Sequence, residues 1–233
     1  MAAIEGILFD KDGVLFDFQK TWGAWTKGVI AGFADGDPGL AKRLADVLDF
    51  DAEAGTFRRG SFVIAGTAQQ VVDALSRELP DWEPDALYNH IKQQTARAPQ
   101  VEAVRLRPTL DALKARGLRL GIATNDAEAA ARANVASVDA LEPFDFIAGS
   151  DSGFGAKPAP GMCLGFAQAM GLPPEALVMV GDSTHDMIAA RAAGFARVAV
   201  LTGVATHADL APHADAVLPD IGALGAWLDA RGE

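Results

Sequence analysis

Five short apolar segments, alternating with stretches of helical spacing, are the feature of this sequence that most constrains its fold. The apolar segments are residues 4–9, 118–124, 144–148, 177–180 and 198–201, and helical patterns cover 109–116, 127–138, 161–170 and 185–193. Short, nearly continuous apolar runs are typical of strands buried on both faces of a sheet. Strands that alternate with helices predict an α/β fold, with a Rossmann-like parallel sheet and helices on both of its faces.

Residues 16–104 interrupt this alternation with four helical patterns and no strand pattern. Apolar residues recur there at the three-and-four spacing of amphipathic helices, over 22–33, 40–48, 71–79 and 87–91. We therefore expect a helical cap domain at 16–104, inserted after the first strand into a core domain made of 1–15 and 105–233. Such a cap would lie over the carboxyl edge of the sheet. Trp22, Trp25 and Phe33 are expected to form its core rather than a substrate-stacking face.

The charge balance narrows the range of partners. The chain of 233 residues has 20 Lys and Arg residues against 31 Asp and Glu residues, a net charge of −11. Such a field repels nucleic acid and anionic membranes, so we expect neither as a partner. Cys163 is the only cysteine and is expected in the core, and no apolar run approaches the roughly 20 residues of a membrane span. These features indicate the cytoplasm and leave the oligomeric state open.

Four polar clusters occur at or just beyond the ends of predicted elements. They are Asp10-Lys11-Asp12-Gly13, Thr124-Asn125-Asp126, Lys157-Pro158 and Gly181-Asp182-Ser183-Thr184-His185-Asp186. Taken singly, each has another explanation: a turn or calcium loop, a helix cap, a solvated surface lysine, and an acidic first helical turn. Because parallel strands place their carboxyl ends along one edge, where open sheets bind ligands, we expect the clusters to meet there.

Together and in this order, the clusters resemble the motifs of the haloacid dehalogenase superfamily, in particular its phosphoglycolate phosphatase-like members with an inserted helical cap. The sequence departs from the usual first motif at Lys11 and Val14, where the family has an apolar or aromatic residue and a threonine. The resemblance implies a phosphatase that uses Mg2+ to hydrolyse a small phosphorylated metabolite, phosphoglycolate-like or a sugar phosphate, through an aspartyl-phosphate intermediate.

The resemblance also assigns roles to the first cluster. Asp10 would attack phosphorus, and Asp12 would protonate the leaving oxygen and then activate the hydrolytic water. Residues two apart in an extended chain face opposite ways, so the two carboxylates can share a site only if the backbone turns sharply. Gly13 permits such a turn.

By the same resemblance, the metal would be held at the ends of two strands. Asp10, the backbone carbonyl of Asp12 and Asp182 would be the protein ligands of Mg2+, which prefers hard oxygen donors. Asp186, four residues beyond Asp182, would support this set through water or through the nearby lysine.

The two remaining clusters would meet the phosphoryl group. Lys157 would offset the negative charge of the nucleophile and of the phosphate. Thr124, with Asn125 beside it, would donate hydrogen bonds to phosphoryl oxygens. His185 has neither a second nitrogen ligand nor an oriented nucleophile near it in the sequence, so its role stays open.

One segment of the insert lacks a helical pattern. Residues 55–61 contain Arg58 and Arg59 between two glycines. Arginine binds planar anions through paired hydrogen bonds, so both residues are candidate substrate ligands. Two solvated arginines at a junction between helices are an equally good interpretation.

Other functions fit the same motifs. A phosphomutase of the β-phosphoglucomutase type would use an acid/base from the cap to return the phosphoryl group to a sugar. A non-catalytic phospholigand-binding module would keep the fold without turnover. A dehalogenase is disfavoured, because that family pattern lacks the second aspartate, here Asp12.

Overall fold

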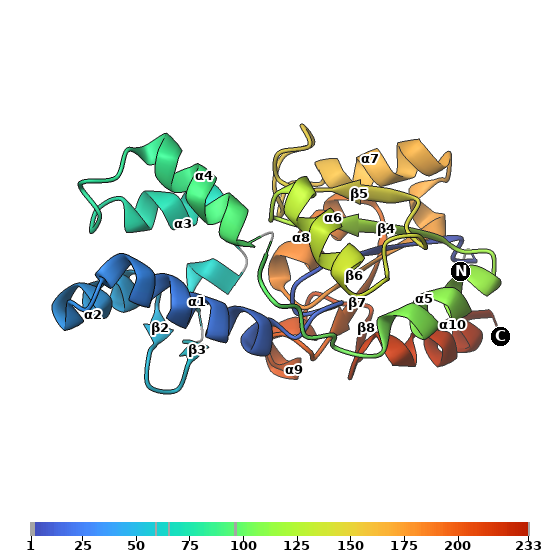
Figure 1. Cartoon of the computed structure of the whole chain (residues 1–233). Helices are drawn as coiled ribbons and strands as arrows, with labels where there is room; N and C mark the ends of the chain where they lie inside the picture. The colour runs from blue at the N-terminus through green and yellow to red at the C-terminus, as the bar shows by residue number, and fades with distance from the viewer. Residues whose placement is uncertain (1–2, 59, 65, 96, 233) are drawn as a thin grey trace.

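The computed structural model describes residues 3–58, 60–64, 66–95 and 97–232. Over these residues the chain forms an α/β part around one sheet and a helical part beside it (Figure 1). The larger sheet has six parallel strands in the order β5-β4-β1-β6-β7-β8. Their bounds are β1 Gly6–Phe9, β4 Arg119–Ala123, β5 Phe146–Ala148, β6 Leu177–Gly181, β7 Ala196–Val200 and β8 Ala216–Leu218. This architecture confirms the predicted fold class.

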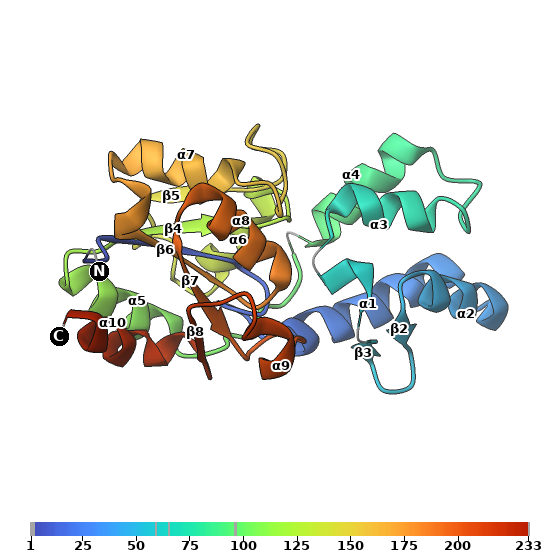
Figure 2. The ribbon, with the colours of Figure 1, turned by 180° about the vertical axis from the view of Figure 1, so that it is seen from behind.

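Strand β1 shows why the sheet needs helices on both faces. Ile7 and Phe9 belong to one core cluster and Leu8 to another, and all three side chains are fully buried. The first cluster is covered by α5 (Leu106–Ala115), α6 (Glu128–Ser137) and α10 (Leu224–Gly232), and the second by α7 (Gly161–Met170) and α8 (Thr184–Ala193) (Figure 2). A short helix, α9 (His207–Leu210), precedes the last strand.

The sequence pattern did not reveal β8. This strand has three residues, all of them half-buried, and it pairs only with β7 at the edge of the sheet. A short, half-exposed edge strand has neither a continuous apolar run nor enough residues for a clear alternation.

Over its described residues, the inserted region has four α-helices and a core of its own. The helices are α1 (Phe18–Ala34), α2 (Pro38–Val47), α3 (Ala68–Leu75) and α4 (Pro84–Thr95). They correspond to the four helical patterns of the sequence. Trp22, Leu44, Leu75 and Leu87 are buried in a cluster separate from those of the sheet. This separate core supports our proposal that 16–104 is a cap domain and that 1–15 with 105–233 form the core domain.

A small hairpin corrects one expectation for the insert. Strands β2 (Phe50–Asp51) and β3 (Thr56–Phe57) pair antiparallel, so the expectation of an insert without strands was wrong here. Gly55, with a φ of +70°, lies just before β3. Two-residue strands are too short to produce an alternating pattern, although the rings of Phe50 and Phe57 pack 5.1 Å apart in the insert's core.

The two connections between the insert and the α/β part run side by side. The backbone N–H of Asp17 donates to the carbonyl of Val101 at 2.8 Å, and that of Ala103 donates to the carbonyl of Leu15 at 2.9 Å. The chain therefore leaves and re-enters the α/β part through one paired segment.

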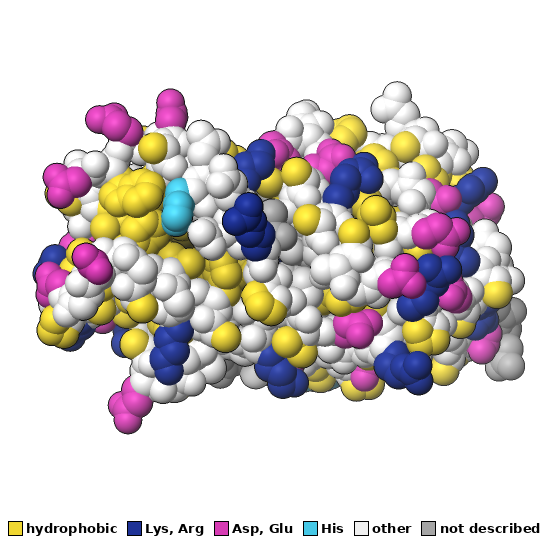
Figure 3. Space-filling view, viewed as in Figure 1, with side chains coloured by type: hydrophobic (Ala, Val, Ile, Leu, Met, Phe, Trp, Pro, Cys, Tyr) yellow, Lys and Arg dark blue, Asp and Glu magenta, His cyan; other side chains and the backbone are white. Residues whose placement is uncertain are grey.

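The surface carries both signs of charge. In the view of Figure 3, acidic and basic side chains are interspersed, and hydrophobic side chains gather in a hollow between the helices of the insert. Among the described residues, no helix combines the length and the apolar character needed to cross a membrane.

Candidate active site

The carboxyl ends of β1, β4 and β6 lie next to one another at the centre of the sheet. Phe9 of β1 is in register with Ile122 of β4 and with Val180 of β6. Asp10, directly after β1, therefore lies between the ends of both neighbours. Thr124 and Asp182 follow those neighbours directly, so three side chains that are far apart in the sequence meet at one edge.

Gly13 turns the chain directly after Asp12. Its φ of +76° lies in the left-handed region that favours glycine. A Cβ at this position would overlap the carboxylate of Asp182. The hydroxyl of Thr202 fixes the turn by donating to the Gly13 carbonyl oxygen at 2.6 Å. The first polar cluster thus contacts the fourth through backbone that has no room for a side chain.

Three carboxylates and one amine form a buried charge cluster. Nζ of Lys157 lies 2.8 Å from Oδ1 of Asp10 and 2.6 Å from Oδ1 of Asp186. Carboxylate oxygens of Asp10, Asp182 and Asp186 lie within 4.8 Å of one another. The side chains of Lys157 and Asp186 are 3% and 0% exposed, so solvent screens these charges little.

The first turn of α8 holds Asp186 in place. Ser183, the N-cap residue of this helix, donates to Oδ2 of Asp186 from its backbone nitrogen at 3.1 Å and from its hydroxyl at 2.6 Å. Because Lys157 binds Oδ1, both oxygens of Asp186 have protein partners. This arrangement suits a supporting residue better than a direct metal ligand.

The pKa values in this cluster reflect an excess of negative charge. Burial raises the pKa of Asp10 to about 7; Lys157 opposes the rise, and the charge of Asp186 adds to it. Burial, together with Asp10 and Asp186, raises the pKa of Asp182 well above its usual value. Although burial acts to lower it, the pKa of Lys157 is raised by the two carboxylates it binds. Three crowded carboxylates against one ammonium leave an excess of negative charge, which favours binding of a hard divalent cation.

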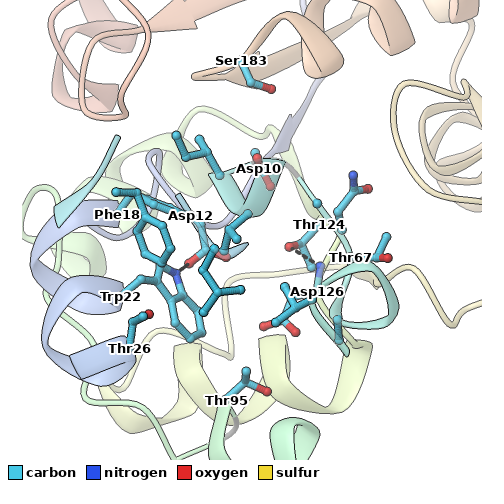
Figure 4. Close-up of a pocket in the computed structure, with 18 of the residues that line it drawn as sticks. Asp10, Asp12, Phe18, Trp22, Thr26, Thr67, Thr95, Thr124, Asp126 and Ser183 are labelled. Atoms are coloured by element: carbon cyan, nitrogen blue, oxygen red, sulfur yellow. Dashed lines mark hydrogen bonds between the residues drawn. The ribbon is translucent and has the colours of Figure 1, made fainter. Parts of the chain in front are cut away.

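The carboxylate of Asp12 is bound by one residue of the insert, Trp22, and by its neighbour in the loop after β1, Lys11 (Figure 4). Its Oδ1 accepts a hydrogen bond from Nε1 of Trp22 at 2.6 Å. Nζ of Lys11 lies 3.0 Å from Oδ1 and 2.8 Å from Oδ2. Trp22 is part of the insert's core, as expected, and it also lines the cavity described below.

Lys11 is a fully buried cation. Besides Asp12, it binds Oδ1 of Asn134 at 3.1 Å and lies 3.4 Å from Oδ2 of Asp126. The sequence interpretation treated Lys11 only as a departure from the family pattern. A lysine two residues beyond a buried strand was the available signal for this network, whereas nothing in the sequence pairs Trp22 with Asp12.

Thr124 and Asn125 have different environments. The Thr124 hydroxyl accepts a hydrogen bond from the backbone of Asp126 at 3.1 Å, which leaves its own proton for another acceptor. The amide of Asn125 donates to the carbonyl of Lys157 at 2.9 Å and accepts from its backbone nitrogen at 2.8 Å. Asn125 therefore fixes the backbone that carries the buried lysine.

A cavity of about 90 Å³ is lined both by these groups and by side chains of the insert. Figure 4 shows Phe18 and Trp22 of α1 on one side, next to Asp12, and Thr124 on the other side. Of the predicted site residues, the lining includes Asp10, Asp12, Thr124, Asn125 and Lys157. The others, Gly13, Asp182 and Asp186, contact those residues without being among the described lining residues.

The structure leaves Arg58 outside this cavity. Its side chain is exposed and is not among the described lining residues, whereas its neighbour Phe57 is. Arg59 lies outside the described residues. His185 lines the cavity, and its Nδ1 is buried without a hydrogen-bond partner in the described part of the chain.

Comparison with known proteins relates this site to enzymes of one family. A family model described as haloacid dehalogenase-like hydrolase matches residues 4–194. The phosphoglycolate phosphatase of Rhodospirillum rubrum is 35% identical over 119 residues, which are 51% of this chain and 49% of that protein. The phosphoglycolate phosphatase of Escherichia coli is 37% identical over 95 residues, 41% of this chain and 38% of that protein. The matches thus span about half of the first relative and less of the second.

A solved structure shows the same fold over a longer stretch. The crystal structure of CbbY from Rhodobacter sphaeroides in complex with phosphate has a TM-score of 0.67 and 22% sequence identity, and the alignment covers 97% of this chain and 99% of that one. The family model extends from before Asp10 to beyond Asp186, well over half of the chain. On this match, the protein belongs to the haloacid dehalogenase-like hydrolases.

Proposed function

We propose that this protein is a Mg2+-dependent phosphatase that hydrolyses a small phosphomonoester through an aspartyl-phosphate intermediate. The observation that carries the proposal is the buried cluster in which Asp10, bound to Lys157, faces a cavity and adjoins Asp182. Such a cluster offers a nucleophile, a compensating cation and oxygen donors for a metal, which are the groups that phosphoryl transfer needs.

The donor set supports Mg2+ as the metal. Asp10, Asp182 and the backbone carbonyl of Asp12 would hold the ion, and Asp186 would support them, since both of its oxygens are bound by Lys157 and Ser183. When bound, Mg2+ would supply positive charge that offsets the charge of the carboxylates and of the phosphoryl group.

In the first step, a carboxylate oxygen of Asp10 attacks phosphorus and the ester P–O bond breaks. Oδ1 of Asp10 accepts from the backbone of Lys11 at 2.7 Å and from Lys157 at 2.8 Å, and these bonds fix the orientation of the carboxylate. Asp12 delivers a proton to the departing oxygen, which leaves as the alcohol. Thr124 donates its remaining hydroxyl proton to a phosphoryl oxygen.

In the second step, water attacks phosphorus in the aspartyl phosphate. Asp12, now a carboxylate, takes a proton from that water, and the bond between phosphorus and the Asp10 oxygen breaks. Inorganic phosphate is released and both carboxyl groups return to their starting states. Asn125 contributes by holding the backbone of Lys157 in position throughout.

The cavity lining favours a phosphatase over a phosphomutase. A phosphomutase needs an acid/base from the cap, yet the described residues of the insert that line the cavity include no Asp, Glu, His, Lys or Arg. The lining on the insert's side is thus suited to excluding charge rather than to protonating a sugar hydroxyl.

The test is phosphate release from a panel of phosphorylated metabolites with Mg2+ or with EDTA. We expect turnover by the wild type with Mg2+, loss of turnover in EDTA, and no turnover by Asp10→Asn in either. Unchanged turnover by folded Asp10→Asn would contradict the nucleophile assignment. Isomerisation of a sugar phosphate without release of phosphate would favour the phosphomutase, and phosphate-ester binding without turnover would favour a binding module.

A further inference from the structure

The cavity has two chemically different walls. The wall from the α/β part contributes polar and charged side chains, among them Asp10, Asp12 and Lys157. The wall from the insert is formed by hydrophobic side chains, including Phe18, Trp22, Trp25, Phe57, Ile64 and Val71, with threonines between them. No charged residue is among the described lining residues of the insert. A phosphoryl group held at Asp10 would therefore direct the rest of the ester toward hydrophobic side chains.

Among the described residues, the cavity has no lysine or arginine free to pair with a second negative charge on the substrate, and His185 is its one other basic side chain. Of these two residue types, the described lining contains only Lys157, and it is bound to Asp10 and Asp186. The buried amine of Lys11 is bound to Asp12 and Asn134. A carboxylate on the leaving group would have to lose its water without gaining a counter-ion, which is strongly unfavourable.

A third carboxylate in the wall, beside those of Asp10 and Asp12, adds to this exclusion. Asp126 lines the cavity and its side chain is 11% exposed. Its one close cation, Lys11, lies 3.4 Å away and binds Asp12 more closely, at 2.8 Å. A substrate carboxylate in this cavity would face a like charge.

One polar group in the insert's wall is free to bind a neutral ligand. Thr26 on α1 is among the residues that line the cavity, and it is 1% exposed. Its Oγ1 has no hydrogen-bond partner among the described residues. A buried hydroxyl without a partner is rare in folded proteins and is satisfied when a ligand supplies one. A hydroxyl can give or accept a hydrogen bond but cannot neutralise a carboxylate.

We infer that the substrate of this enzyme is a phosphomonoester of a small, uncharged, largely apolar alcohol, and that phosphoglycolate is discriminated against. The inference rests on the proposed phosphatase function and names the substrate class for that same site. Phosphate binds at the charged wall, and the carbon skeleton of the alcohol packs against the insert's hydrophobic side chains, with the Thr26 hydroxyl as its polar contact.

Two esters of nearly equal shape test the inference directly. Isobutyl phosphate and phosphoglycolate share the CH2–O–P linkage, and an isopropyl group in the first replaces the carboxylate of the second. We expect kcat/KM of the wild type with Mg2+ to be about 100-fold higher for isobutyl phosphate, the scale on which hydrophobic pockets discriminate. An equal or higher kcat/KM for phosphoglycolate would overturn the inference.

A substitution in the wall supplies a second test. Val71→Lys adds a cation to the lining, and Val29→Lys adds one to a half-buried position of α1 that is not among the described lining residues. We expect Val71→Lys to shift the ratio of the two kcat/KM values toward phosphoglycolate by about tenfold, and Val29→Lys to leave the ratio unchanged. If folded Val71→Lys keeps the wild-type ratio, the insert's wall does not select the leaving group, and the inference fails.

Failure of the inference and failure of the phosphatase proposal give different results. Suppose that kcat/KM is higher for phosphoglycolate than for isobutyl phosphate and that Asp10→Asn hydrolyses neither ester. That result would overturn the inference and leave the phosphatase mechanism standing. Absence of phosphate release from every ester of the panel would overturn both.

Discussion

The indole nitrogen of Trp22, in the first helix of the insert, donates a 2.6 Å hydrogen bond to Oδ1 of Asp12, in the loop after the first strand of the sheet. The bond joins a core residue of the insert to the carboxyl group to which we assign proton transfer. Lys11, the neighbour of Asp12 in the same loop, binds the same carboxylate. The orientation of Asp12 therefore depends on where the insert lies relative to the sheet.

Replacement of Trp22 tests this dependence. Trp22→Phe keeps an aromatic ring in the insert's core but removes the donor to Asp12. We expect kcat to fall at least about tenfold, because small displacements of a catalytic group are costly, and the free energy of unfolding to fall by about 1 kcal/mol. Both quantities are measured by steady-state kinetics and urea denaturation.

The control for that variant is Trp82→Phe. Trp82 packs against Phe33 in the same insert and is not among the described residues that line the cavity. We expect the Trp82→Phe variant to have a lower free energy of unfolding and an unchanged kcat. Equal losses of kcat in both variants would mean that the insert's packing, rather than the bond to Asp12, controls the rate.

Removal of the buried amine of Lys11 should destabilise the fold. Lys11→Met leaves the carboxylates of Asp12 and Asp126, which are 16% and 11% exposed, without their close cation. We expect a loss of about 3 kcal/mol in the free energy of unfolding, the usual result of breaking a buried ion pair from one side. Lys20→Met, which removes the exposed partner of Asp17, should cost less than about 1 kcal/mol. Urea denaturation that gives the two variants equal stability would contradict the assignment of Lys11 to a buried network.

Binding of Mg2+ should stabilise the protein more at alkaline than at acid pH. A carboxyl group whose pKa is raised on folding, as that of Asp10 is to about 7, holds its proton more tightly in the folded state. The metal-free protein therefore loses stability as pH rises from about 4 to 7. Mg2+ competes with these protons, so saturating MgCl2 should raise Tm by roughly 5 °C at pH 8 and by less at pH 5.5.

Thermal unfolding with KCl of equal ionic strength is the control for this measurement. Asp182→Asn removes one of the proposed ligands and should abolish most of the Mg2+-dependent shift. A shift that is equal at both pH values, or that persists in Asp182→Asn, would argue against a metal held by the acidic cluster.

Cys163 should be chemically inert in the folded protein. It is fully buried between α7 and the sheet, and burial raises the pKa of its thiol to about 12. The thiolate is the reactive form, so iodoacetamide at pH 8 should leave the native protein unmodified. Mass spectrometry should find one adduct after unfolding in urea. Alkylation of the native protein at the rate of the unfolded chain would show that the thiol is accessible.

Much of the fold could be predicted because the strands of a parallel sheet and the helices between them each leave a recognisable pattern in the sequence. The continuous apolar run around Leu8 is required by burial on both faces, and Gly171 and Gly194 end their helices with positive φ values of 66° and 80°. The last strand and the hairpin of the insert escaped prediction because two or three residues do not establish a period. Their place is decided by pairing partners that only the folded chain brings near.

The site could be anticipated only in part for the same reason. Asp10, Thr124 and Asp182 follow adjacent strands, so topology alone brings them together. The contact between Asp12 and Trp22 depends on how the insert packs over the sheet, which no sequence spacing encodes. The exposure of Arg58 has a similar origin, since the neighbouring Phe57 occupies the insert's interior.

The paired connections between the insert and the sheet limit how substrate can enter. Because the backbones near Asp17 and Val101 are hydrogen-bonded to each other, we expect the insert to swing about a single axis along that pair rather than to twist freely. Such a swing would part Trp22 from Asp12 each time the enzyme opens. A new ester would then enter while Asp12 lacks its bond to Trp22, and closure over the ester would restore that bond in every catalytic cycle.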